Sequence, residues 1–125
     1  MDSVRIQREF AAAKLEFPNV ELRLNTNSDL FVKAALQTSV GGIYFLSITF
    51  EGFPNNLPRI VVDSPSLSTS SPHRYREGNI CYMHPSLWNP GTHDLTFVIA
   101  RASKWLNKYE VWKSGRGWPG AQLRH

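Results

Sequence analysis

The chain has 125 residues, of which 42% are hydrophobic and 19% charged, and its formal net charge is +4. These values predict one globular domain over residues 1–125 that buries about two thirds of its unfolded surface without a disulfide or a structural metal. No apolar run approaches the roughly 20 residues that a membrane-spanning helix needs. The first residues lack the basic and then apolar pattern of a signal peptide, so we expect a cytoplasmic protein with no membrane partner.

The first predicted element is an amphipathic helix. It starts from a capping residue at Asp2 or Ser3, and Pro18 ends it because proline cannot continue the hydrogen-bond ladder. Apolar residues recur at steps of four, three and four, which places them on one helical face: Ile6, Phe10, Ala13 and Phe17.

Four strands are expected next, joined by short turns that suit an antiparallel meander. Residues 25–29 and the pair Gly41-Gly42 have turn composition. The predicted strands cover residues 20–24, 30–36, 44–50 and 58–62. Helical and strand patterns in this order indicate an α+β domain.

Residues 64–79 are rich in Ser and Pro and follow neither period, so they predict a long loop, which in a small domain often carries function. A second helix is expected to begin near Thr92 or Asp94. The glycines and the proline of residues 112–120 predict that regular helix is absent there, with the tryptophans packed back on the domain. The apolar stripe of the second helix consists of Leu95, Val98, Ile99, Ala102, Leu106 and Tyr109.

Cys81 is the only cysteine of the chain and follows the predicted loop. A lone thiol cannot form an intramolecular disulfide, so it either packs as a small apolar side chain or reacts. Nearby histidines and arginines favour reaction, and a free thiol suits a reducing compartment.

The order of these elements, with the motifs between them, resembles the ubiquitin-conjugating enzyme family and its short bacterial members. Residues 44–50 are similar to the third strand of the family, and residues 52–60 to its aromatic-proline turn before the fourth. The segment around the cysteine and the following tryptophan-x-proline are also similar: Pro72-His73, Gly78-Asn79-Ile80-Cys81 and Trp88-Asn89-Pro90. The resemblance spans roughly residues 1–110.

Two departures accompany the resemblance. His73 stands where the family has an asparagine before its cysteine. The two additional C-terminal helices of the eukaryotic enzymes are absent, and the end of the chain, from Trp118 to His125, resembles that of bacterial members. Such relatives occur with ubiquitin-like conjugation systems, including the antiphage systems called CBASS, in which the conjugated chain is the C-terminus of a cGAS-like nucleotidyltransferase (CD-NTase).

The resemblance implies that Cys81 carries the C-terminal acyl group of a ubiquitin-like protein or a CD-NTase as a thioester and passes it to a lysine or another amine. His73 is the candidate that replaces the asparagine, either as a donor to the developing oxyanion or as a brace of the loop. Asn79, His84 and His93 are auxiliary candidates, each with a structural alternative.

Arginines near the cysteine have two interpretations. Arg74 and Arg76 either lower the pKa of the thiol and hold an acidic tail, or are simply solvated. The chain shows no phosphate-binding glycine motif and no cofactor site, so activation of the acyl group is expected from a separate activating enzyme.

Other classes of protein agree less well with the sequence than a conjugating enzyme does. An inactive relative would use the same fold as a binding module that regulates a partner. A zinc site formed by Cys81, His84 and flanking histidines would offer only one thiolate, and a papain-like protease would need a different order of elements. A nucleic-acid-binding domain would cluster Lys and Arg with exposed aromatic residues, whereas the positive charge here is dispersed.

Overall fold

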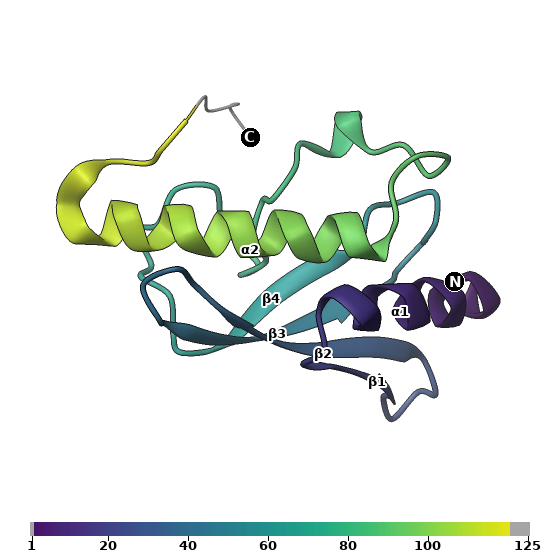
Figure 1. Ribbon diagram of the computed structural model, residues 1–125. Coiled ribbons are helices and arrows are strands. Elements are labelled where there is room, and N and C mark those ends of the chain that lie inside the picture. Colours follow the sequence, from purple (N-terminus) through teal and green to yellow (C-terminus); the bar gives the residue numbers. More distant parts are fainter. Residues whose placement is uncertain (1, 121–125) are drawn as a thin grey trace.

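The computed structural model describes residues 2–120, which form two helices packed on one face of a four-stranded sheet (Figure 1). The predicted α+β order of helix, meander and second helix is therefore confirmed. The elements are α1 (Ser3–Glu16), β1 (Val20–Leu24), β2 (Leu30–Gln37), β3 (Ile43–Thr49), β4 (Arg59–Ser64), the short 3-10 helix η1 (Pro85–Leu87), α2 (Leu95–Val111) and the π-helical turn η2 (Trp112–Arg116).

The sheet is an antiparallel meander in which each strand pairs with the next along the chain. Side chains alternate between the two faces of the sheet. Tyr44, Leu46 and Ile48 of β3 are therefore buried under the helices, whereas Phe45, which lies between Tyr44 and Leu46, is 49% exposed. One face of the sheet thus builds the core and the other faces solvent.

The helices form where capping residues begin them. The Asp2 carboxylate accepts a hydrogen bond from the Arg5 amide at 3.0 Å, and the Asp94 carboxylate accepts one from the Phe97 amide at 2.8 Å, so each residue is the N-cap of its helix. The predicted stripe of α2 is buried throughout, and Trp105 belongs to it as well.

Hydrogen bonds connect α1 to the start of α2 and to the residues just before it. The Glu9 carboxylate accepts from the Leu95 amide at 2.8 Å, and the Arg5 guanidinium donates to the carbonyls of Pro90 and His93 at 2.7 and 3.1 Å. Because these bonds satisfy backbone groups at and before the N-terminus of α2, they set the direction in which the chain passes from the segment after η1 into α2.

In the C-terminal segment the α-helix ends at Val111, and residues 112–116 form one wider, π-helical turn. Gly115 interrupts this turn with a φ of 92° that non-glycine residues rarely adopt, so regular helix is absent there as predicted. The half-buried Trp112 and Trp118 pack against the core, as predicted. The resemblance of the chain end, Trp118 to His125, to that of bacterial members extends to residues outside the described range.

Among residues 2–120, no helix is both long and apolar enough to cross a bilayer.

Candidate active site

The segment that carries Cys81 is held at the edge of the sheet by backbone hydrogen bonds. The Ile80 amide donates to the Ile60 carbonyl of β4 at 2.9 Å, and Asn79 forms an isolated bridge with Val61. The Cys81 amide donates to the His73 carbonyl at 2.8 Å. Since β4 is part of the rigid sheet, the position of the thiol is set by the scaffold rather than by a free loop.

Side chains brace the loop before the cysteine. The Tyr109 hydroxyl of α2 accepts from the Ser68 amide at 2.8 Å, and the Arg74 guanidinium donates to the Ser68 carbonyl at 3.0 Å. Arg74 therefore spans the loop, and Arg76 is exposed. Of the two interpretations of these arginines, the solvated one fits Arg76, and the basic residue whose charge opposes the raised pKa of the Cys81 thiol is Arg101 of α2.

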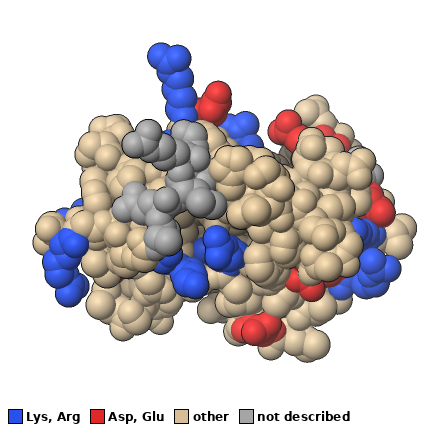
Figure 2. All heavy atoms as spheres, turned by 90° about the horizontal axis from the view of Figure 1, so that it is seen from above, with Lys and Arg blue, Asp and Glu red and all other residues tan. Residues whose placement is uncertain are grey.

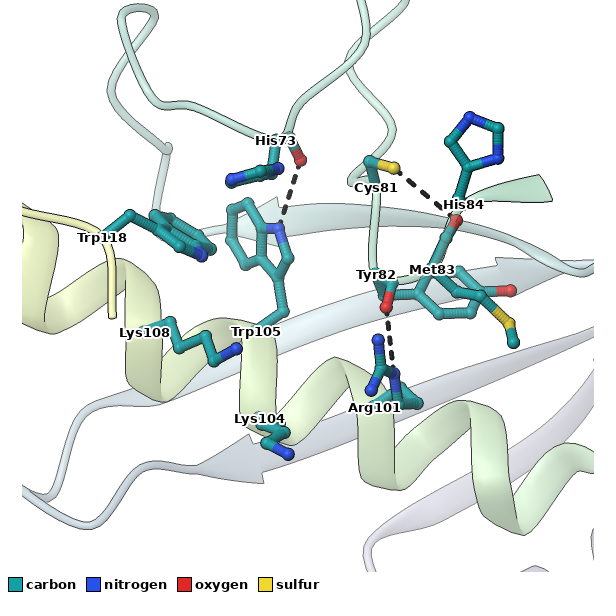
Figure 3. Close-up of a pocket in the computed structure, with 10 residues that line it drawn as sticks. All are labelled: His73, Cys81, Tyr82, Met83, His84, Arg101, Lys104, Trp105, Lys108 and Trp118. Carbon is teal, nitrogen blue, oxygen red and sulfur yellow. Dashed lines mark hydrogen bonds between the residues drawn. The ribbon is translucent and has the colours of Figure 1, made fainter. Parts of the chain in front are cut away.

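The Cys81 thiol is buried, with 5% of the residue exposed. The Tyr75 hydroxyl donates to Sγ at 3.2 Å. Sγ in turn donates to the Met83 carbonyl at 3.6 Å, as Figure 3 shows. Burial raises the pKa of the Cys81 thiol, while Tyr75, a backbone hydrogen bond at Met83 and the charge of Arg101 oppose that rise. The free thiol is consequently protonated at neutral pH.

Tyr75 stays a hydrogen-bond donor across the physiological range, because burial and the neighbouring thiol raise its pKa to about 12. A donor at this position stabilises a thiolate more than a thiol. It therefore favours the formation of a thiolate at Cys81.

A hollow of about 100 Å³ lies beside Cys81. Its wall includes an aromatic cluster in which the Trp118 ring lies 5.0 Å from the His73 ring and 5.2 Å from the Trp105 ring. The Trp105 indole donates to the His73 carbonyl at 3.1 Å, the same carbonyl that holds the Cys81 amide. The lining residues are His73, Cys81, Tyr82, Met83, His84, Arg101, Lys104, Trp105, Lys108 and Trp118 (Figure 3).

The structure brings some of the predicted site residues together and separates others. Cys81, His73 and His84 line one hollow. In Figure 3 the His73 ring lies towards Trp118, and the Cys81 sulfur points the other way, to the side of His84. Asn79 instead lines a second hollow, of about 340 Å³, on the β4 side of the cysteine together with Tyr75.

His84 and His93 have local structural contacts. Nδ1 of His93 accepts from the Asn89 amide at 3.0 Å, and its ring stacks on Phe97 at 4.3 Å. Nδ1 of His84 accepts from the Ser86 amide at 3.2 Å and so caps η1. Trp88 donates to the Pro54 carbonyl at 2.8 Å and packs on Phe53, so it joins the segment after Cys81 to the β3–β4 turn.

Three residues of the site were missed from the sequence. Trp105 extends the helical stripe at steps of three from Ala102 and four to Tyr109, so periodicity alone identifies it as buried. No sequence pattern identifies Tyr75 or Arg101 as neighbours of the thiol, because their contact with it depends on how the loop lies over α2.

Removing the Tyr75 hydroxyl should change the acidity of the thiol. We expect Tyr75→Phe to raise the pKa of Cys81, so that alkylation by iodoacetamide at pH 8 slows about tenfold, the effect of one hydrogen bond to a charged group. The full rate–pH profile should move to higher pH. Tyr44→Phe is the matched control, since Tyr44 is a buried tyrosine that adjoins Glu110 rather than the cysteine. An unchanged profile for Tyr75→Phe would show that its hydroxyl does not act on the thiol.

Within residues 2–120, no three His, Cys, Asp or Glu side chains gather in a group that could hold a metal ion.

A four-stranded antiparallel meander with its cysteine segment between β4 and the following helix defines a protein of the ubiquitin-conjugating fold class. A solved structure described as a complex of the Vps23 UEV with ubiquitin shares this fold, with a TM-score of 0.61 and 14% identity over 84% of this chain and 82% of that one. The family model described as Type II CBASS E2 protein matches residues 9–125. The chain therefore belongs to the Type II CBASS E2 family, whose E2-like character supports a conjugating-type role. No curated protein matches it.

Proposed function

We propose that this protein is a cytoplasmic acyltransferase of antiphage defence that carries the C-terminal acyl group of another protein on Cys81. The donor is a ubiquitin-like protein or a CD-NTase, and the acceptor is a lysine or another amine. The observation that carries the proposal is the setting of the thiol: its amide is fixed by His73 and its sulfur receives a hydrogen bond from Tyr75 at 3.2 Å.

The chemistry proceeds in two exchanges at one carbonyl carbon. The Cys81 sulfur loses its proton and attacks an activated acyl group, such as a thioester presented by a separate activating enzyme, whose own thiolate leaves. The amine nitrogen then attacks the new thioester, the carbon–sulfur bond breaks, and the amine loses a proton. The sulfur departs as a thiolate, which the Tyr75 hydroxyl stabilises.

His73 is proposed as a positioning residue. Its carbonyl accepts hydrogen bonds from both the Cys81 amide and the Trp105 indole, so its backbone connects the cysteine to α2. Its φ of 55° lies in the left-handed region, where Asn is also well tolerated, so His73→Asn should preserve this geometry. In this proposal the side-chain donor at the reacting sulfur is Tyr75, which acts on the thiolate and not on the oxyanion.

The test is a loading assay that combines the protein with ATP, a CD-NTase encoded by a neighbouring gene, and the corresponding activating enzyme. Non-reducing electrophoresis should show an adduct that thiol reagents remove, and mass spectrometry of the peptide that contains Cys81 should show the donor C-terminus attached to it. An adduct that resists thiol reagents in the wild-type protein, or one attached elsewhere, would contradict the assignment of Cys81.

The burial of Cys81 and its raised pKa favour a second candidate, a binding module of the same fold that regulates a partner without acyl transfer. The similar solved structure described as a complex with ubiquitin supports a ubiquitin-like partner for either candidate. A partner that binds with the same affinity to the wild-type protein and to Cys81→Ala, in the absence of any loading, would select the binding module.

A further inference from the structure

Three basic side chains of α2 face the hollow beside Cys81. Arg101, Lys104 and Lys108 follow one another at steps of three and four, which places them along one side of the helix (Figure 3). In the view of Figure 2, Lys and Arg atoms lie near the middle of the face seen from above. We call these three residues the basic strip.

The positive charge of the basic strip is not neutralised within the part of the chain that the structure describes. No Asp or Glu lines this hollow, and the ion pairs of residues 2–120 join other residues: Arg5 with Glu9, Arg23 with Glu21, and Lys33 with Asp63. Burial and the charges of Lys104 and Arg101 lower the pKa of Lys108, which is the expected effect of like charges held close together. An anion at the strip would relieve this repulsion.

The position of Arg101 is fixed, because its Nε donates to the Tyr82 carbonyl at 3.1 Å, next to the cysteine. The remaining guanidinium nitrogens are donors to an anion. Lys108 lies seven positions after Arg101, so the strip extends about 10 Å along the helix. An extended peptide covers that distance with about three residues.

The size of the hollow limits its ligand. A volume of about 100 Å³ is below the range of about 300 to 1,000 Å³ that is typical of sites for nucleotides and other small molecules. It suits one or two carboxylate side chains of a peptide that continues away across the surface.

We propose that the basic strip binds acidic side chains of the donor protein, located two to four residues before the C-terminal residue that is attached to Cys81. The identity of this segment as the donor terminus rests on the proposed function. The strip would select donors by charge and would align the terminal carbonyl with the sulfur before the bond forms.

The experiment measures binding without acyl transfer, so its outcome does not depend on thioester formation. Full-length Cys81→Ala protein is titrated into a fluorescein-labelled peptide amide that ends in glycine and carries two glutamates shortly before it, and into the same peptide with glutamines. Fluorescence anisotropy should give about fivefold tighter binding of the glutamate peptide at low salt, as expected for two exposed ion pairs. The preference should disappear at about 300 mM salt.

Variants then assign the effect to the strip. Lys104→Gln/Lys108→Gln should remove the preference for glutamate, and thermal melting verifies that the protein stays folded. The matched control is Arg8→Gln/Lys113→Gln, which removes the same charge at exposed positions outside the hollow and should keep the preference. Equal affinity for both peptides, absence of binding, or an equal loss in the control would each overturn the proposal. So would binding of adenosine monophosphate without any preference for glutamate, since the anion would then be a phosphate.

Discussion

Cys81→Ala is expected to abolish the thiol-sensitive adduct completely while the protein remains folded. Alanine removes only the sulfur from a buried position of small volume, and the amide that bonds to the His73 carbonyl is unchanged. Without a sulfur no thioester forms, so the loading assay should give no adduct at any pH. Far-ultraviolet circular dichroism and urea unfolding verify the fold.

Two replacements at Cys81 strengthen this test. Cys81→Ser should give an oxygen ester that resists thiol reagents, and Cys81→Lys should give a stable amide, each at a lower rate than the wild-type thioester. Cys81→Ala/Ala100→Cys moves the lone thiol to an exposed position of α2 and serves as the control. An adduct in the control would mean that any accessible thiol is acylated, and an adduct in Cys81→Ala would remove Cys81 from the mechanism.

Trp105→Ala is expected to have the largest effect on stability, about 4 kcal/mol in the free energy of unfolding. Trp105 is 3% exposed, stacks on the Tyr109 ring at 5.5 Å, and its indole holds the His73 carbonyl. The substitution leaves a cavity beneath the active-site segment, so thiol alkylation should also become faster in the folded protein. Urea unfolding and alkylation rates measure the two effects.

Trp105→Phe separates packing from hydrogen bonding. It retains an aromatic ring but removes the donor to the His73 carbonyl, which keeps its bond from the Cys81 amide, so the expected loss is about 1 kcal/mol. Trp112→Ala is a control on the neighbouring turn, because Trp112 is half-buried and its ring also lies near Tyr109, at 5.9 Å, but it does not line the hollow beside Cys81. If Trp112→Ala cost as much as Trp105→Ala, the special role of Trp105 beneath the site would be wrong.

Much of the fold follows from local patterns. The apolar stripes of α1 and α2, the alternation of the strands, and the caps at Asp2 and Asp94 were predicted to within a few residues. The fourth strand begins at Arg59 rather than Pro58, since proline has no amide to donate to the ladder. Regular helix ends before residues 112–116 as predicted, since Gly115 takes a non-helical φ of 92° within the wider turn that forms there.

The order of motifs around Cys81 was sufficient to place this protein in its family, because the spacing of turn, loop and helix signals is a property of the chain alone. The setting of the thiol required the tertiary structure. Tyr75 and Arg101 act on Cys81 from six residues before it and from another element, and burial, which raises the pKa of the thiol, is a property of the packed domain. The sequence thus pointed to Cys81 as the candidate nucleophile, whereas the environment of the thiol depends on contacts between residues that no local pattern relates.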